Sequence, residues 1–340
     1  MSSSSTSSAL IVGAGSVGVM TALDLSRAGA AVTFLVRPHR QEQLSRPQIL
    51  YSYDDQTLDT LSGYEVLTDP AALAGSSFDA VIVTLDSASL HAEAGQQLTQ
   101  QLGRALKGTE TAVVLASVGI ELDSWFLEHS GLQAEQVAYG STAALIHEVP
   151  AAAELPHHPG IEADLLAQAD YAYRRFSPSV AFSVADSSPR LAETVKALFD
   201  APGLPACDVV DASQLKVGPA AIAAILGWSL LGWPALADVE AANPTWVLGV
   251  RAMQEFQRLP VFGQAGQAAA EQTTPEGVLA QLQQAEQTSL PLDYAGFNAY
   301  HHGGKVNKQD VAVFRDAVSR ADTETPALQE LIDRLSAARS

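Results

Sequence analysis

A glycine pattern close to the start of this chain leaves few folds open to it. Residues 10–22 read LIVGAGSVGVMTA, with Gly13, Gly15 and Gly18 in the spacing G-x-G-x-x-G between an apolar strand and a helix. A dinucleotide-binding turn requires this context. Gly13 permits the tight turn, Gly15 lets the backbone approach a pyrophosphate, and Gly18 allows close helix–strand packing. We predict a nucleotide site here; the alternative is a glycine-rich turn without a ligand.

Apolar segments rich in β-branched residues alternate with helical segments as far as Asp211, where the strand signals stop. This alternation predicts a mostly parallel sheet covered on both faces. We therefore expect an α/β protein with a disordered tail over 1–8, a Rossmann-type domain over 9–211 and an all-helical domain over 212–340. The expected strands are 9–15, 30–37, 79–85, 111–117, 136–142, 180–185 and 206–210.

Composition narrows the possible partners. The formal net charge of −19 argues against a nucleic-acid or anionic-membrane surface, since either needs a concentrated basic face. Cys207 is the single cysteine, which excludes an internal disulfide and favours a reducing compartment, the cytoplasm. Glycines and a proline interrupt the apolar run 220–237, so we expect a buried helix there rather than a membrane span. This helix makes a homodimer possible, but burial within its own domain explains it equally well.

The end of the second expected strand indicates which cofactor binds. An NAD site places Asp or Glu there, but this chain has Val36 followed by Arg37, His39 and Arg40. A cluster of cations suits the 2′-phosphate of NADP(H), the cofactor that we predict; the alternative is a set of exposed loop cations. The predicted cofactor contacts are Gly13, Ala14, Gly15, Ser16, Val17, Gly18, Arg37, Arg40, Leu85 and Val118.

Together with the glycine pattern and Arg37, the stretch SQLKVGPAAIAAILGW (213–228) makes the chain resemble the ketopantoate reductase family over nearly its whole length. The resemblance implies a helical C-terminal domain arranged as in 6-phosphogluconate dehydrogenase. It also implies NADPH-dependent reduction of a 2-oxo acid, with Lys216 donating the proton. An ammonium in a partly desolvated site has a lowered pKa and can act as a general acid. The alternative is a surface lysine at a helix start.

The chain departs from the pattern of this family at several polar positions. An Asn-Gly pair, a lysine, a second asparagine and a C-terminal glutamate are replaced. A site that loses such contacts changes its substrate. We therefore expect a bulkier or less polar ketone than ketopantoate. The residues found at these positions are Val118-Gly119, Asp86, Pro219 or Ala220, and Lys305.

Aromatic residues of the helical part could line a pocket for such a ketone: Trp228, Trp233, Trp246 and Phe256. The alternative is that they form the core, because aromatic residues at helical spacing usually pack.

The stretch HHGGKVNKQD (301–310) is predicted as a loop and helix entry. Asn307 would cap a helix that begins near Lys308. Lys305 would recruit a substrate carboxylate or polarise the carbonyl. The predicted catalytic residues are Lys216 and Lys305, and the predicted substrate contacts are His301, His302, Trp228 and Asn298.

Other chemistries lack their motifs. His157, His158, His301 and His302 show no metal-ligand spacing, so no metal is expected. No G-x-S-x-G occurs, and the GGK of residues 303–305 lacks the rest of a Walker loop. Three functions stay open: an NADPH-dependent reductase of a ketone or 2-oxo acid, a redox-neutral or non-catalytic NADPH-binding descendant, and an opine-type dehydrogenase.

Overall fold

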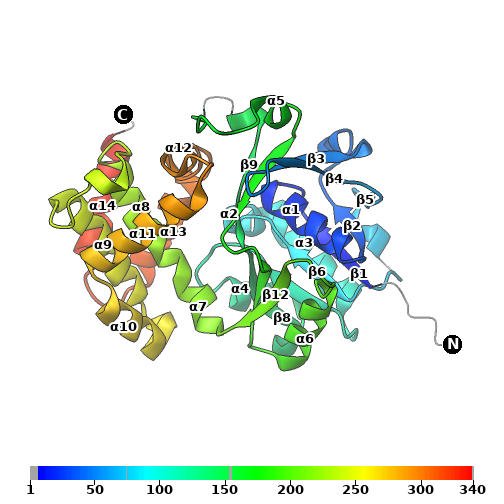
Figure 1. Ribbon diagram of the computed structural model, residues 1–340. Helices are drawn as coiled ribbons and strands as arrows, with labels where there is room; N and C mark the ends of the chain where they lie inside the picture. Colours follow the sequence, from blue (N-terminus) through cyan, green and yellow to red (C-terminus); the bar gives the residue numbers. More distant parts are fainter. Residues whose placement is uncertain (1–6, 74, 153–154, 339–340) are drawn as a thin grey trace. The chain divides into compact units, whose positions relative to one another are not determined.

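The computed structural model describes residues 7–73, 75–152 and 155–338 (Figure 1). The chain divides into two compact units, Met1–Ala151 with Glu162–Leu215, and Ala152–Ile161 with Lys216–Ser340. The domains expected from the sequence, 9–211 and 212–340, remain a prediction. The compact units differ from them at segment 152–161, where His157 forms an isolated antiparallel bridge with Leu292 of the helical unit.

The first unit is built on an eight-stranded sheet in the order β12-β11-β8-β7-β6-β1-β2-β5. Neighbouring strands run parallel except β8 and β11. Every residue of β6 and β7 is buried, which requires cover on both faces. The predicted mostly parallel α/β sheet is confirmed. The strands are β1 (Ser8–Val12), β2 (Ala31–Leu35), β5 (Glu65–Leu67), β6 (Ala80–Val83), β7 (Ala112–Leu115), β8 (Val137–Thr142), β11 (Val180–Ala185) and β12 (Ala206–Val210).

The last two residues of the expected N-terminal tail, Ser7 and Ser8, are ordered. Residues 1–6 of the expected tail lie outside the described residues, but Ser8 already belongs to β1. The backbone N–H of Ala31 donates to the carbonyl of Ser7 at 2.7 Å. Pairing with β2 therefore orders these two serines, whose side chains carry no strand signal of their own.

A second sheet, which the sequence did not predict, has the order β4-β3-β10-β9. Strands β3 (Gln48–Ser52) and β4 (Thr57–Leu61) form an antiparallel pair, β10 (Tyr171–Arg175) runs parallel to β3, and β9 (Ala144–Glu148) runs antiparallel to β10. Most of β4 is exposed or half-buried, so its sequence lacks a continuous apolar run.

Helix α1 (Ser16–Arg27) contacts strands of both sheets: β1, β2, β8 and β11 of the large one, and β4 and β9 of the small one. It is therefore buried nearly all round rather than along one stripe. Its buried Asp24 pairs with Arg175 of β10, with Nη2 of the arginine 2.5 Å from Oδ1. This ion pair ties α1 to the second sheet.

The remaining helices of the first unit connect or cover these strands. They are α2 (Ser87–His91), α3 (Glu93–Leu106), α4 (Leu122–Ser130), α5 (Ala163–Leu166) and α6 (Pro189–Leu198); α7 (Ala212–Val217) crosses the boundary between the two units.

The second unit is helical, as predicted, and α9 (Pro244–Gln257) is its centre. Helices α8 (Ala221–Ser229), α10 (Gly263–Gln272), α11 (Pro275–Ser289) and α14 (Pro326–Ala337) pack on α9. A Cβ added to Gly227 would lie 2.8 Å from the Cα of Gly249, so α8 and α9 are in backbone contact. The apolar run 220–237 thus packs within its own unit. Among the described residues, no helix has the length and apolar character that a membrane crossing requires.

Candidate functional site

The glycine turn between β1 and α1 has the geometry that its sequence predicts. Gly13 adopts a φ of 104°, and its N–H donates to the carbonyl of Leu35 at 3.0 Å. A Cβ on Gly18 would lie 2.3 Å from the carbonyl oxygen of Gly13, whereas a Cβ on exposed Gly15 would meet no protein atom within 4 Å. Gly13 and Gly18 are thus required by the backbone geometry of the turn, independently of any ligand. The open side at Gly15, at the N-terminus of α1, fits the pyrophosphate of a dinucleotide.

The other predicted cofactor contacts lie at the same edge of the sheet. Strand β1 stands between β2 and β6, and the four parallel strands β2, β1, β6 and β7 end at this edge. Leu85 and Val118 follow β6 and β7 and are half-buried. Ser16 and Val17 open α1. The order reverses at β1, and ligands of open α/β sheets bind at such a switch point.

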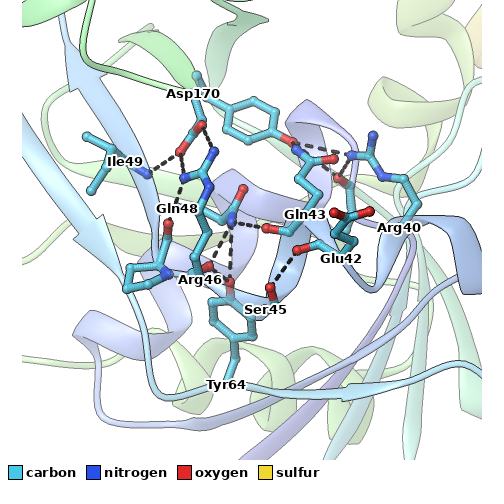
Figure 2. Close-up of polar contacts among 12 residues, drawn as sticks. Arg40, Glu42, Gln43, Ser45, Arg46, Gln48, Ile49, Tyr64 and Asp170 are labelled. Atoms are coloured by element: carbon cyan, nitrogen blue, oxygen red, sulfur yellow. Dashed lines mark hydrogen bonds and ion pairs between the residues drawn. The ribbon is translucent and has the colours of Figure 1, made fainter.

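The three cations after β2 have different surroundings. Arg37 and His39 are exposed, while Arg40 is half-buried. Nη2 of Arg40 donates to the carbonyl of Ala14 at 2.6 Å and lies 3.4 Å from the hydroxyl of Tyr171 (Figure 2). Arg40 therefore contacts the glycine turn directly, whereas Arg37 faces solvent.

Both predicted catalytic lysines belong to the helical unit. Lys216 is half-buried in the last turn of α7. Lys305 is exposed in the segment His301–Lys305, which is a π-helical turn between α12 (Tyr294–Tyr300) and α13 (Asn307–Arg320) rather than the expected loop. The N–H of Val306 donates to the carbonyl of His301, five residues back, at 2.9 Å. Such turns are rare and are frequent at functional sites.

Side-chain hydrogen bonds hold this π turn. Nδ1 of His302 lies 2.9 Å from Oδ2 of Asp310, and the amide of Asn307 donates to the carbonyl of His302 at 2.7 Å. Asn307 and Asp310 are buried, and His301 stacks on Phe297 with ring centroids 5.4 Å apart. The predicted capping role of Asn307 is wrong: α13 begins at Asn307, and its side chain reaches back into the π turn.

Two predicted substrate contacts lie in the core. Trp228 is fully buried, and its indole N–H donates to the carbonyl of Pro234 at 2.9 Å. Asn298 is 2% exposed, and its amide donates to the carbonyl of Tyr294 at 2.8 Å. Both side chains satisfy neighbouring backbone groups, which favours a role in the core; their assignment as substrate contacts stays a prediction. Trp246 and Phe256 are buried as well, in agreement with the core alternative.

Trp233 is the one of the four predicted pocket aromatics that is not fully buried, and it has an unusual backbone conformation. It is half-buried, with a φ of 61°. A bulky residue in the left-handed region is rare, and such strain often marks functional sites. A Cβ on Gly303 would lie 3.3 Å from the indole, so Trp233 borders the π turn. From the sequence, Trp233 was predicted only as one of four aromatic residues that could line a pocket. The sole local sequence sign of its left-handed backbone is the tripeptide G-W-P (232–234).

One departure from the resembled family, Asp86, and the glycine retained beside another, Gly119, have structural roles. Asp86 caps α2, accepting from the N–H and the hydroxyl of Ser89 at 2.7 Å each. A Cβ on Gly119 would lie 3.1 Å from the Cβ of Ser87, so this glycine allows the loop after β7 to approach α2. Over the described ranges, no three His, Cys, Asp or Glu side chains form a metal-binding group.

The fold and the turn define a class of protein: a Rossmann-type α/β unit with a glycine-rich turn at the switch point of its sheet, in one chain with a helical unit. The sequence model of the family "Ketopantoate reductase PanE/ApbA" matches residues 9–141. This match confirms, over residues 9–141, the resemblance to the ketopantoate reductase family that the sequence predicts. No curated protein matches the chain significantly.

Solved structures of this family share the fold of the whole chain. A PanE/ApbA family ketopantoate reductase from Ralstonia eutropha JMP134 is 18% identical, covers 97% of each chain and has a TM-score of 0.62. A 2-dehydropantoate 2-reductase from Geobacter metallireducens GS-15 is 17% identical over 97% of this chain and 99% of its own, with a TM-score of 0.63. D-mandelate dehydrogenase in complex with NADH is 15% identical over 97% and 98%, with a TM-score of 0.60.

Proposed function

We propose that this protein is an NADPH-dependent reductase that converts the ketone of a 2-oxo acid to an alcohol. The observation that carries the proposal is the glycine turn, with exposed Gly15 at the switch point of the sheet. The family match over 9–141 supports it, as does the shared fold with ketopantoate reductases and D-mandelate dehydrogenase.

Arg37 supports NADPH as the cofactor. It is exposed and directly follows Val36 at the end of β2, where an NAD-binding site would present a carboxylate. Its planar guanidinium can pair bidentately with a 2′-phosphate. D-mandelate dehydrogenase is solved in complex with NADH, so the shared fold alone does not select the cofactor, and we propose that Arg37 does so in this chain.

The glycine turn at residues 13–18 would hold the reduced cofactor, whose nicotinamide would supply the hydride that the carbonyl carbon accepts. The ammonium of Lys216 donates a proton to the carbonyl oxygen and stabilises the negative charge that develops there. Lys305 pairs with the substrate carboxylate. The products are a 2-hydroxy acid and the oxidised cofactor.

We propose that the substrate is bulkier and less polar than ketopantoate. Trp233 beside Gly303 provides an apolar wall next to the turn that carries Lys305. Lys305 occupies the position at which the resembled family has a glutamate. Because the charge there is positive, we propose that the site favours a substrate that presents a second carboxylate oxygen to Lys305 over one that presents a hydroxyl. A 2-oxo acid with an aromatic substituent combines these features.

We place the reaction in the cytoplasm, since the only cysteine, Cys207, is buried and reduced.

The test is an assay of NADPH oxidation with a panel of 2-oxo acids that includes phenylglyoxylate and ketopantoate. We expect turnover with phenylglyoxylate above that with ketopantoate. Lys216→Ala should lower kcat by about 100-fold or more while NADPH still binds. Lys305→Ala should mainly raise KM.

Full activity of Lys216→Ala would contradict the assignment of the acid. NADPH binding without turnover on any ketone would favour a non-catalytic descendant. Consumption of NADPH only when an amino acid is added with the 2-oxo acid would favour an opine-type dehydrogenase.

A further inference from the structure

The segment between β2 and β3 is fastened to the start of β10. The carboxylate of Asp170 accepts from both terminal nitrogens of Arg46, at 2.9 and 2.5 Å, and from the N–H of Ile49 at 2.9 Å (Figure 2). The buried amide of Gln48 donates to the carbonyls of Gln43 and Arg46 at 2.9 Å each. Residues 40–49, which follow the cofactor-selecting end of β2, are thus held against the second sheet.

Tyr171, the first residue of β10, extends this attachment to the glycine turn. Its side chain is fully buried, and its hydroxyl accepts from the amide of Gln43 at 3.1 Å. The same hydroxyl lies 3.4 Å from the carbonyl oxygen of Ala14. Arg40 donates to that oxygen at 2.6 Å and lies 3.4 Å from the hydroxyl. We call Arg40, Gln43 and Tyr171 the Ala14 clamp, because Arg40 and Tyr171 contact this carbonyl and Gln43 donates to the Tyr171 hydroxyl.

Holding the carbonyl of Ala14 orients the next N–H. In a trans peptide the C=O and N–H bonds point in opposite directions, and the carbonyl of Ala14 and the N–H of Gly15 share one peptide plane. The clamp therefore sets the direction of the Gly15 N–H at the start of α1. This is the backbone that the glycine pattern exposes to a pyrophosphate.

We propose that the Ala14 clamp consists of positioning residues of the cofactor site, and that Arg40 does not select between NADPH and NADH. This inference rests on the proposed function. Both cofactors contain the pyrophosphate, but only NADPH contains the 2′-phosphate. Loss of the clamp therefore weakens both by the same factor, and the preference for NADPH belongs to Arg37.

The experiment measures dissociation constants of NADPH and NADH by nucleotide fluorescence on the full-length protein and its variants. Tyr171→Phe, which removes a single hydroxyl, should weaken both cofactors about fivefold. Arg40→Met should weaken both about tenfold or more, because a charge-assisted hydrogen bond is lost. Arg40→Lys keeps the charge without the planar guanidinium and should give a smaller loss, again equal for both.

Two further variants calibrate these effects. Arg37→Met should lower the affinity for NADPH about tenfold or more and leave that for NADH unchanged. Ser45→Ala is the matched control: its exposed hydroxyl donates to the carbonyl of Glu42 in the same segment but does not reach the glycine turn. It should leave both constants unchanged, and thermal unfolding of every variant monitors the fold.

Three results would overturn the inference. The first is an affinity ratio of NADPH to NADH that collapses in Arg40→Met and Arg40→Lys, which would make Arg40 a phosphate ligand. The second is unchanged affinity in Tyr171→Phe, even if its melting temperature falls, since the hydroxyl would then serve the fold alone. The third is a wild-type protein that binds neither nucleotide, which would remove the proposed function as well. Binding that is identical in wild type and clamp variants removes the clamp only.

Discussion

The glycine turn at residues 13–18 and the π turn at residues 301–305 both contain glycines and both carry predicted site residues, but different forces shape them. In the first, the φ of 104° at Gly13 and the 2.3 Å between a Cβ on Gly18 and the Gly13 oxygen make glycine a steric requirement. In the second, a Cβ on Gly304 would meet its nearest atom only at 3.9 Å, and buried Asn307 and Asp310 hold the backbone through His302. Backbone sterics can be predicted from a motif, whereas a turn shaped by particular side chains cannot.

Gly18→Ala should have the largest effect on stability. The added methyl group would overlap the carbonyl of Gly13, so the turn must open, at a cost of about 3 kcal/mol. Urea unfolding measures the loss, and NADPH titration should show that binding is lost with it. Wild-type stability in this variant would mean that the first turn is as tolerant as the second.

Asn307→Ala should be the most damaging substitution in the π turn. It removes a buried amide that donates to the carbonyl of His302, which costs about 1–3 kcal/mol. Urea unfolding again measures the change, with exposed Lys308→Ala as a control that should stay within about 0.5 kcal/mol of wild type. If the two variants behave alike, side-chain hydrogen bonds do not hold this turn.

The attachment of the glycine turn to the second sheet should depend on pH. Burial acts to raise the pKa of Asp170, but hydrogen bonds from Arg46 and the N–H of Ile49 outweigh it and lower that pKa. A carboxyl whose folded pKa lies below its unfolded value of about 4 stabilises the fold above that value. The contribution disappears as the pH falls through the folded pKa.

Asp170→Asn should therefore destabilise the protein at pH 7 by about 1 kcal/mol or less, because Arg46 is largely exposed and water screens the pair. At pH 3 the variant and the wild type should differ less. Urea unfolding at both pH values tests this, and a difference that grows on acidification would reverse the sign.

Gly304→Ala should have the smallest effect. The position is open and outside the left-handed region, so alanine should stabilise the protein by about 0.5 kcal/mol through lower entropy of the unfolded chain. The variant is compared with Gly18→Ala by urea unfolding under the same conditions. A loss of more than about 1 kcal/mol would show that glycine is required in both turns.

Much of the large sheet could be predicted because its strands are continuous apolar runs. The expected strands 180–185 and 206–210 match β11 and β12 at both ends. The expectations for 9–15 and 30–37 ran past β1 and β2 into the turns, since apolar and small residues continue after the backbone pairing stops. The pairing of β3 with β10 could not be predicted because these strands are far apart in sequence and meet only in the folded chain, where Leu50 pairs with Tyr171.

The candidate site, like the sheets, has a part that could be predicted from the sequence and a part that depends on the folded chain. The glycine turn, Leu85 and Val118 come to one edge of the sheet because parallel strands end together. The burial of Trp228 and Asn298 could not be decided from the sequence, because an aromatic or amide side chain in a helix looks the same in sequence whether it faces a ligand or the core. The contacts of Trp228 with Pro234 and of Asn298 with Tyr294, which favour the core, are seen only in the folded chain.

The amino-acid sequence by itself determined the glycine turn, the parallel sheet and the change to helices after Asp211, because local sterics and hydrophobic periodicity act over a few neighbouring residues. The tertiary structure alone decided that Arg175 neutralises Asp24 inside the protein, and that Tyr171 reaches the carbonyl of Ala14 from 157 residues away. Such contacts depend on which distant strands become neighbours, and α1 brings them together by packing against both sheets.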